Sequence, residues 1–123
     1  MKTLLTAILL LTAATAHAQF QHQPVQSYVN EVFENVQGYI VEYGEQDGMP
    51  YVRGFTSKHM DFELVRTMVG LATTTNRNVE LFESWSKADN GYNYTVVIDR
   101  KYVVLIRYYT PSKGLGIIYS EIK

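Results

Sequence analysis

Side chains able to act as nucleophiles or as acid–base groups are scarce in this chain. It has no cysteine, which excludes thiol catalysis, and its three histidines are His17, His22 and His59. His17 lies in an N-terminal apolar segment. His22 lies in the short segment that follows, which we expect to be flexible, so its side chain would be poorly held for a catalytic base. A Ser-His-Asp arrangement would therefore have to use His59.

The string His59-x-Asp61-x-Glu63 offers side chains that could bind a metal ion. On a helix, however, residues two positions apart point in different directions, so Asp61 would not face the same ion as the other two. Acidic residues at this spacing are typical of a helix start, where they cap amides and complement the dipole. We therefore expect helix capping and no metal site.

Glu83 is the carboxylate with the most unusual sequence setting. Every second residue around it is apolar, namely Val79, Leu81 and Trp85. A strand with this alternation would place Glu83 among apolar side chains, where a carboxyl can become a general acid or base. The alternatives are a solvated Glu83 near a sheet edge and a Glu83 paired with Arg107 or Arg53. No second carboxylate is placed to complete a glycosidase-like pair.

Aromatic and arginine side chains on the predicted C-terminal strands form a second type of candidate site. They are Trp85, Tyr92, Tyr94, Arg107, Tyr108 and Tyr109. Trp, Tyr and Arg are the residues most often found as anchors of protein interfaces. The competing interpretation is that Tyr92, Tyr94 and Tyr108 only build the core, and the strand register decides between the two.

Residues 1–18 have the pattern of a secretory signal peptide. Lys2 precedes the apolar run Leu4–Leu11, and small residues lead up to Ala18. The apolar run is shorter than the roughly 20 residues that span a bilayer. We expect cleavage near Ala18, a periplasmic or secreted location without a lipid anchor, and no membrane span in the mature chain.

After the leader we expect a flexible lead-in at residues 19–24 and a single domain at residues 25–123. Apolar residues recur every three or four positions from Val25, which predicts an amphipathic helix to about Val36 or Gln37. Residues 38–43 fit either a continued helix or a strand, and we favour a strand.

The next segments predict a hairpin and a second helix. A turn at 44–48 separates the strand ending at Tyr43 from a strand at 51–56. Asp61 is expected to cap a helix, whose glycine, Gly70, would permit close approach to a neighbour. Thr73–Asn76 is expected to be the exit loop. The apolar face of this helix comprises Phe62, Val65, Met68, Val69 and Ala72, widened by Leu64 and Leu71.

The last third predicts a four-stranded meander, with strands at 79–86, 92–98, 102–109 and 115–122. The loop Asp99-Arg100-Lys101 determines which side chains share a face. A loop of odd length sets Ile98 opposite Tyr102 and extends the apolar face along every second residue of the next strand. A two-residue loop would place Arg107 on that face, so we expect the odd loop.

These elements predict an α+β fold class: two helices packed on one face of an antiparallel sheet, with a C-terminal four-stranded meander. The charges, 11 Lys and Arg against 12 Asp and Glu, are dispersed. Without a basic stripe, nucleic-acid binding is not expected. The segment Gly114-Leu115-Gly116 is too short for a phosphate-binding loop, so no cofactor is expected.

The function favoured by these observations is that of a small exported domain that binds a protein or an envelope component, as inhibitors and immunity proteins do. An alternative is a small-molecule pocket between the helices and a curved sheet, with or without an enzymatic role for Glu83 or His59. In a third interpretation the aromatic residues only build the core. The sequence does not indicate the oligomeric state.

Overall fold

The computed structural model describes residues 20–34, 39–56 and 61–122. The predicted leader, residues 1–18, lies outside this part of the chain, as does His59. No helix within the described ranges is long and apolar enough to cross a membrane. The elements, in chain order, are α2 (Gln23–Phe33), β1 (Tyr39–Gln46), β2 (Met49–Thr56), α3 (Phe62–Thr75), β3 (Val79–Ala88), β4 (Gly91–Ile98), β5 (Tyr102–Tyr109) and β6 (Gly114–Glu121).

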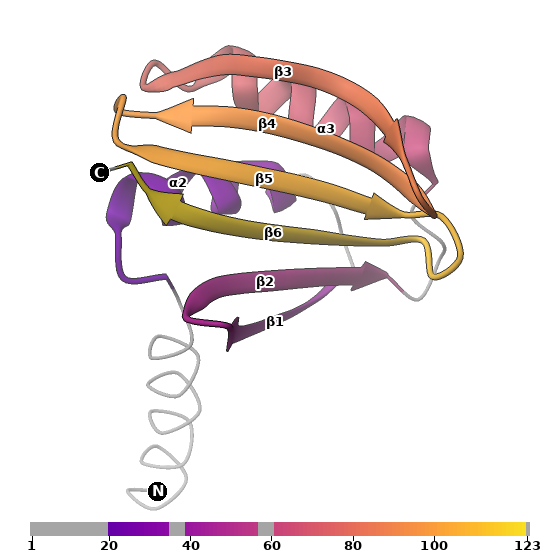
Figure 1. The fold of residues 1–123 in the computed structure, drawn as a ribbon. Helices are drawn as coiled ribbons and strands as arrows, with labels where there is room; N and C mark the ends of the chain where they lie inside the picture. Colours follow the sequence, from indigo (N-terminus) through magenta and orange to yellow (C-terminus); the bar gives the residue numbers. More distant parts are fainter. Residues whose placement is uncertain (1–19, 35–38, 57–60, 123) are drawn as a thin grey trace, which may run out of the picture.

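The six strands form one antiparallel sheet in the order β1-β2-β6-β5-β4-β3. Strands β3 to β6 are consecutive and form the predicted meander, and the β1–β2 hairpin joins it where β2 pairs with β6. Both helices lie on the same side of the sheet (Figure 1). The predicted fold class is therefore confirmed. We call the opposite side, which no described helix covers, the helix-free face.

The turn between β4 and β5 has the predicted odd length. Asp99, Arg100 and Lys101 connect the strands and set Ile98 opposite Tyr102. Asp99 and Arg100 both adopt positive φ angles, 55° and 54°, which reverse the chain within three residues. Alternate residues of β5 then point toward the helices and are buried, whereas Arg107 points to the helix-free face. The register prediction is confirmed.

The N-terminal helix begins two residues earlier and ends earlier than predicted. Pro24 occupies its first turn, where a missing amide proton costs no helical hydrogen bond. Phe20, expected in the flexible lead-in, is only 7% exposed and packs edge-on against the rings of Tyr43 and Tyr119. Its N–H donates to Oε1 of Gln26 at 2.7 Å, so the segment before the helix is attached to the core.

Gln26 is the one fully buried polar side chain of the described core. Besides accepting from Phe20, its Nε2 donates to Asn30 Oδ1 and to the Tyr43 hydroxyl, each at 2.8 Å. A buried amide costs free energy unless it is hydrogen-bonded, and here the carbonyl and both amide protons have partners. The Gln26 side chain thus connects the segment before α2, α2 itself and β1.

The first hairpin is tighter than predicted. β1 continues through Gln46, so residues 44–46 are strand and the turn consists of Asp47 and Gly48 alone. Both turn residues have positive φ, 54° and 79°, as a two-residue hairpin of the Asp-Gly type requires. The strand interpretation of residues 39–43 is confirmed, whereas residues 35–38 lie outside the described ranges.

The second helix begins as predicted and ends later. Asp61 Oδ1 accepts the Leu64 N–H at 2.9 Å, which confirms the cap. Three consecutive threonines, Thr73 to Thr75, remain helical, and each hydroxyl donates to the carbonyl four residues back. The threonines of the predicted exit loop therefore form the last helical turn, and only Asn76 lies beyond the helix, as its C-cap. Leu64 and Leu71 are exposed and do not widen the buried face as expected.

A partly buried hydroxyl pair joins the two helices. The Thr73 hydroxyl donates to the Val69 carbonyl at 2.7 Å, so the Tyr28 hydroxyl, 2.9 Å from Thr73 Oγ1, is the donor of that second bond. Burial raises the pKa of the Tyr28 phenol above its ordinary range. The phenol therefore stays protonated in the folded chain at pH values that ionise it in the unfolded chain.

We predict that Tyr28→Phe flattens the alkaline loss of stability. Because the raised pKa favours the folded state only while the phenol is neutral, the contribution is complete below about pH 10 and is lost as the pH rises further. The variant should lose about 1 kcal/mol near neutral pH, from the missing hydrogen bond, but fall less steeply in alkali. Urea unfolding between about pH 8 and pH 12 measures both effects. Tyr109→Phe, at an exposed phenol, should keep the wild-type slope.

We also predict opposite effects of the same substitution at two glycines. A Cβ at Gly70 of α3 would meet no neighbour within 4 Å, so the expected close approach at this position is wrong. Gly70→Ala should stabilise the protein by up to about 1 kcal/mol through helix propensity. At Gly54 a Cβ would collide with the Phe33 ring, and Gly54→Ala should destabilise by about 2 kcal/mol. Urea midpoints that shift in the same direction would contradict this assignment.

Candidate functional site

The meander register divides the six predicted interface residues between the two faces. Tyr94 and Tyr108 are 6% and 3% exposed and belong to the core under the helices. Tyr92 and Trp85 are partly buried and pack against the same core. Only Arg107 and Tyr109 lie on the helix-free face, so the six residues do not form one surface.

The aromatic residues at the α3 end of the sheet form a closed cluster. Phe62, the first residue of α3, stacks on Tyr92 with ring centres 4.0 Å apart and planes at 11°. The same ring meets Trp85 edge-on at 5.1 Å, and Trp85 lies 4.8 Å from Tyr94. Because α3 covers these rings, they stabilise the attachment of the helix and do not present an open binding surface.

Glu83 does not lie among the apolar side chains with which it alternates in sequence. The pairing of β3 with β4 shifts register between Leu81 and Glu83 and again between Glu83 and Ser86. The first shift sets Glu83 beside Thr95, and the carboxylate is exposed. Phe82, at the first shift, is 71% exposed. The structure therefore supports the solvated alternative for Glu83, which has no ion pair with Arg53 or Arg107.

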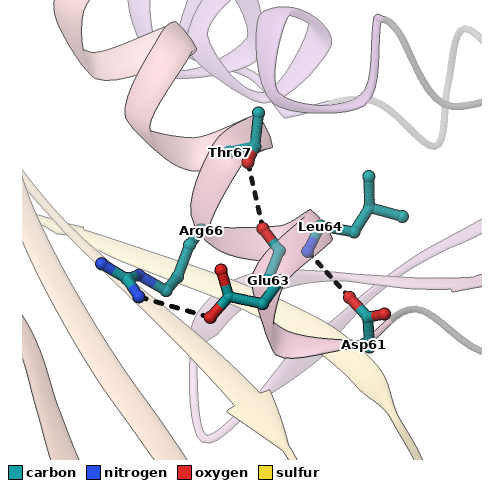
Figure 2. A network of polar contacts seen from close by, with 5 residues as sticks. All are labelled: Asp61, Glu63, Leu64, Arg66 and Thr67. Atoms are coloured by element: carbon teal, nitrogen blue, oxygen red, sulfur yellow. Dashed lines mark hydrogen bonds and ion pairs between the residues drawn. The ribbon is translucent and has the colours of Figure 1, made fainter.

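The acidic residues near His59 act at the start of α3 (Figure 2). Asp61 caps the helix, and Glu63 Oε1 lies 3.4 Å from Arg66 Nη1 in an exposed pair three residues apart. The Glu63 carbonyl accepts the Thr67 hydroxyl at 3.1 Å. Within residues 20–34, 39–56 and 61–122, no three His, Asp or Glu side chains are grouped so that they could hold a metal ion.

A row of six residues, one from each strand, crosses the helix-free face, and all of them except the central glycine have polar side chains. Gly116 of β6 is at its centre, paired with Arg107 of β5 on one side and with Arg53 of β2 on the other. The remaining members are Asn93 and Ser86 beyond Arg107, and Glu42 beyond Arg53. Since paired residues of adjacent antiparallel strands point to the same side, the two arginines flank a position without a side chain.

Each of the two arginines is held by a nearby tyrosine. The Arg53 guanidinium lies 4.9 Å from the ring centre of Tyr51, and that of Arg107 lies 5.7 Å from the ring centre of Tyr109. Arg107 Nε also donates to Asn93 Oδ1 at 2.9 Å. No carboxylate of the described residues is within ion-pair distance of either guanidinium. Both positive charges are thus positioned but not neutralised.

The two arginines border a hollow of about 150 Å³. Its wall also includes Gln46, Tyr51, Tyr109 and Gly116. Tyr51 lies against Gly44, where a Cβ would collide with its phenol end, and Tyr109 comes within 3.5 Å of the Cβ position at Gly116. Glycines at these two positions therefore let the tyrosine side chains lie low over the sheet. We call this site the Gly116 hollow.

A second hollow, of about 480 Å³, lies between the start of α2 and the end of α3. Glu31 Oε1 accepts from Asn76 Nδ2 there at 3.2 Å, and the buried Oε2 has no hydrogen-bond partner among the described atoms. A single carboxylate oxygen can be satisfied by one water molecule, so this hollow is a weaker candidate than the site with two cations.

Sequence reasoning missed Arg53, Tyr51 and Gly116 as members of one site. The β1–β2 hairpin fixes only which face Arg53 shares with Glu42. Its approach to Arg107 depends on the pairing of β2 with β6, more than 60 residues later in the chain. The local signal that could have been used is Gly116 within β6, because a glycine inside a strand often marks a close approach of another group.

We predict that Phe62→Ala opens the aromatic cluster around Trp85. Loss of the stacked ring should reduce the free energy of unfolding by about 2 kcal/mol. It should also shift the emission of Trp85, the single tryptophan, toward longer wavelength as water reaches the indole. Phe82→Ala is the matched control, because this exposed ring should leave stability within about 0.5 kcal/mol and the emission unchanged. Equal effects of the two substitutions would refute the cluster.

The helix-free face thus combines two unneutralised guanidinium groups, two tyrosines and a floor without a side chain. What the chain binds there is inferred from these residues and their arrangement. Comparison of the chain with protein-family models, with curated proteins and with solved structures gives no match.

Proposed function

We propose that this chain is an exported, non-enzymatic binding domain that holds a partner protein against its helix-free face at the Gly116 hollow. The observation that supports this function is the pair of arginines, Arg53 and Arg107, which flank Gly116 without a carboxylate partner among the residues that the structure describes. Charged groups at a protein surface that are positioned but unpaired are available to an external ligand.

The residue types around the hollow favour a protein as the partner. Arg and Tyr are enriched among the residues that dominate the binding energy of protein interfaces. Side chains that dominate the binding energy are most effective when they are already ordered before binding, since ordering a free arginine on binding costs conformational entropy. Contacts with Tyr51 and Tyr109 reduce that cost for the two guanidinium groups.

The alternative of an enzyme with an interior pocket receives less support. The space between the helices and the sheet contains a continuous cluster of apolar side chains, and Glu83 is exposed on the edge strand. No second carboxylate lies beside Glu83 in the described strand pairing. A binding function requires neither an interior pocket nor a pair of carboxylates.

Export is proposed on the sequence of the leader. Lys2, the short apolar run and the small residues before Ala18 have the composition of a cleaved signal peptide. The chain has no cysteine, so the domain would be independent of the oxidising conditions outside the cytoplasm. The partner would then be a secreted protein or a component of the cell envelope.

The test is capture of a partner by the purified protein and by two double variants. We expect wild type and Arg66→Ala/Arg100→Ala to retain the same envelope or secreted protein, and Arg53→Ala/Arg107→Ala to lose it. The control removes two positive charges from α3 and from the β4–β5 turn, so it separates the hollow from net charge. Unchanged circular dichroism should accompany the loss. Equal retention by all three proteins, or no specific retention by any, would refute the proposal.

A further inference from the structure

We infer that the Gly116 hollow recognises the carboxylate of an Asp or Glu side chain of the partner protein, held between Arg53 and Arg107. This inference rests on the proposed function and specifies the chemistry of its ligand. It also assigns Glu42, at the end of the same row, the role of weakening that binding.

The spacing of the two arginines suits a single small anion. Their Cα atoms are separated by two strand spacings, about 10 Å, with Gly116 between them. Arginine side chains are long enough to bring both guanidinium groups over the central strand from that distance. Gly116 contributes no side chain between them, and the ring of Tyr109, 3.5 Å from the Cβ position, forms part of the wall of the hollow that remains for the ligand.

Arginine, and not lysine, occupies both positions, which favours a ligand with a planar pair of oxygens. A guanidinium presents a rigid fork of N–H donors that matches a carboxylate with two parallel hydrogen bonds. Because Nε of Arg107 already donates to Asn93, the terminal nitrogens of that guanidinium are the donors that remain for a ligand. The Asn93 contact thereby orients the donors.

The tyrosines distinguish an acidic protein segment from an acidic sugar. An exposed aromatic ring can serve as a stacking platform for a sugar, provided that its face is free. Here Arg53 lies over the ring of Tyr51, and Arg107 lies near the ring of Tyr109. One face of each ring is taken by an arginine, which reduces the aromatic surface on which a sugar could stack.

Glu42 is the nearest carboxylate in the row, paired across β1 and β2 with Arg53. It is exposed and forms no ion pair with that arginine in the structure. Its charge nevertheless lies on the same face as the incoming anion and repels it. Glu45, three residues later on the same strand, points to the other side and provides a matched control.

The experiment is a titration followed by NMR of backbone amides and arginine Nε–H groups, with the blocked peptide acetyl-Gly-Glu-Gly-amide as the probe. We expect saturable shifts at Arg53, Arg107 and Gly116, which the Gln peptide does not cause. Arg53→Gln or Arg107→Gln should weaken binding roughly tenfold. Glu42→Gln should strengthen it about two- to threefold, whereas Glu45→Gln should leave it unchanged. Added salt should weaken the wild-type interaction.

Three results would overturn the inference. They are equal shifts with the Glu and Gln peptides, binding that is insensitive to Arg53 and Arg107, and binding of tri-galacturonate under conditions in which the Glu peptide does not bind. In each case the capture experiment still decides the proposed function independently. If only the Arg53→Ala/Arg107→Ala variant failed to capture the partner, the hollow would bind a protein without recognising a carboxylate.

Discussion

The pairing register of β4 with β5 is the constraint on which both faces of the sheet depend. The three-residue turn sets Ile98 opposite Tyr102, so the apolar residues of both strands face the helices. Because side chains alternate along a strand, the same choice directs Arg107 to the other side. A register one residue different would bury a guanidinium in the core and expose Ile106. The packing of the interior and the composition of the Gly116 hollow therefore have one physical origin.

The interior compensates for the absence of disulfides with aromatic packing and a small number of fully bonded polar groups. Phe20, Tyr43 and Tyr119 close one end, where the Gln26 side-chain carbonyl accepts the Phe20 N–H. Phe62 and Trp85 close the other end under the first turn of α3. A partly buried hydroxyl pair between Tyr28 and Thr73 holds the two helices together. The aromatic contacts and the hydroxyl pair join segments distant in sequence, which is the role that a covalent crosslink has in many small domains.

Features specified by neighbouring residues could be predicted from the sequence, whereas features that depend on distant partners could not. The Asp61 cap and the odd turn follow from local geometry, and both were predicted. Simple alternation predicted that Glu83 would lie among apolar side chains, but the register shifts in β3 interrupt that alternation. Arg53 joins Arg107 only through the pairing of β2 with β6, a long-range contact without a local signature. The candidate site was accordingly predicted in part, through Arg107 and Tyr109, and its second cation was missed.

The irregular pairing of β3 also affects the edge of the sheet that this strand forms. A straight edge strand exposes a regular ladder of amides and carbonyls onto which another chain can add, and exposed apolar side chains such as Leu81 and Phe82 increase that risk. The two register shifts interrupt this ladder near these side chains, so an incoming strand would meet mismatched donors and acceptors. The displacement of Glu83 to the surface adds a charge at the same edge. The shifts thus reduce intermolecular aggregation through the outer edge of β3 in the folded chain, where these apolar side chains remain exposed.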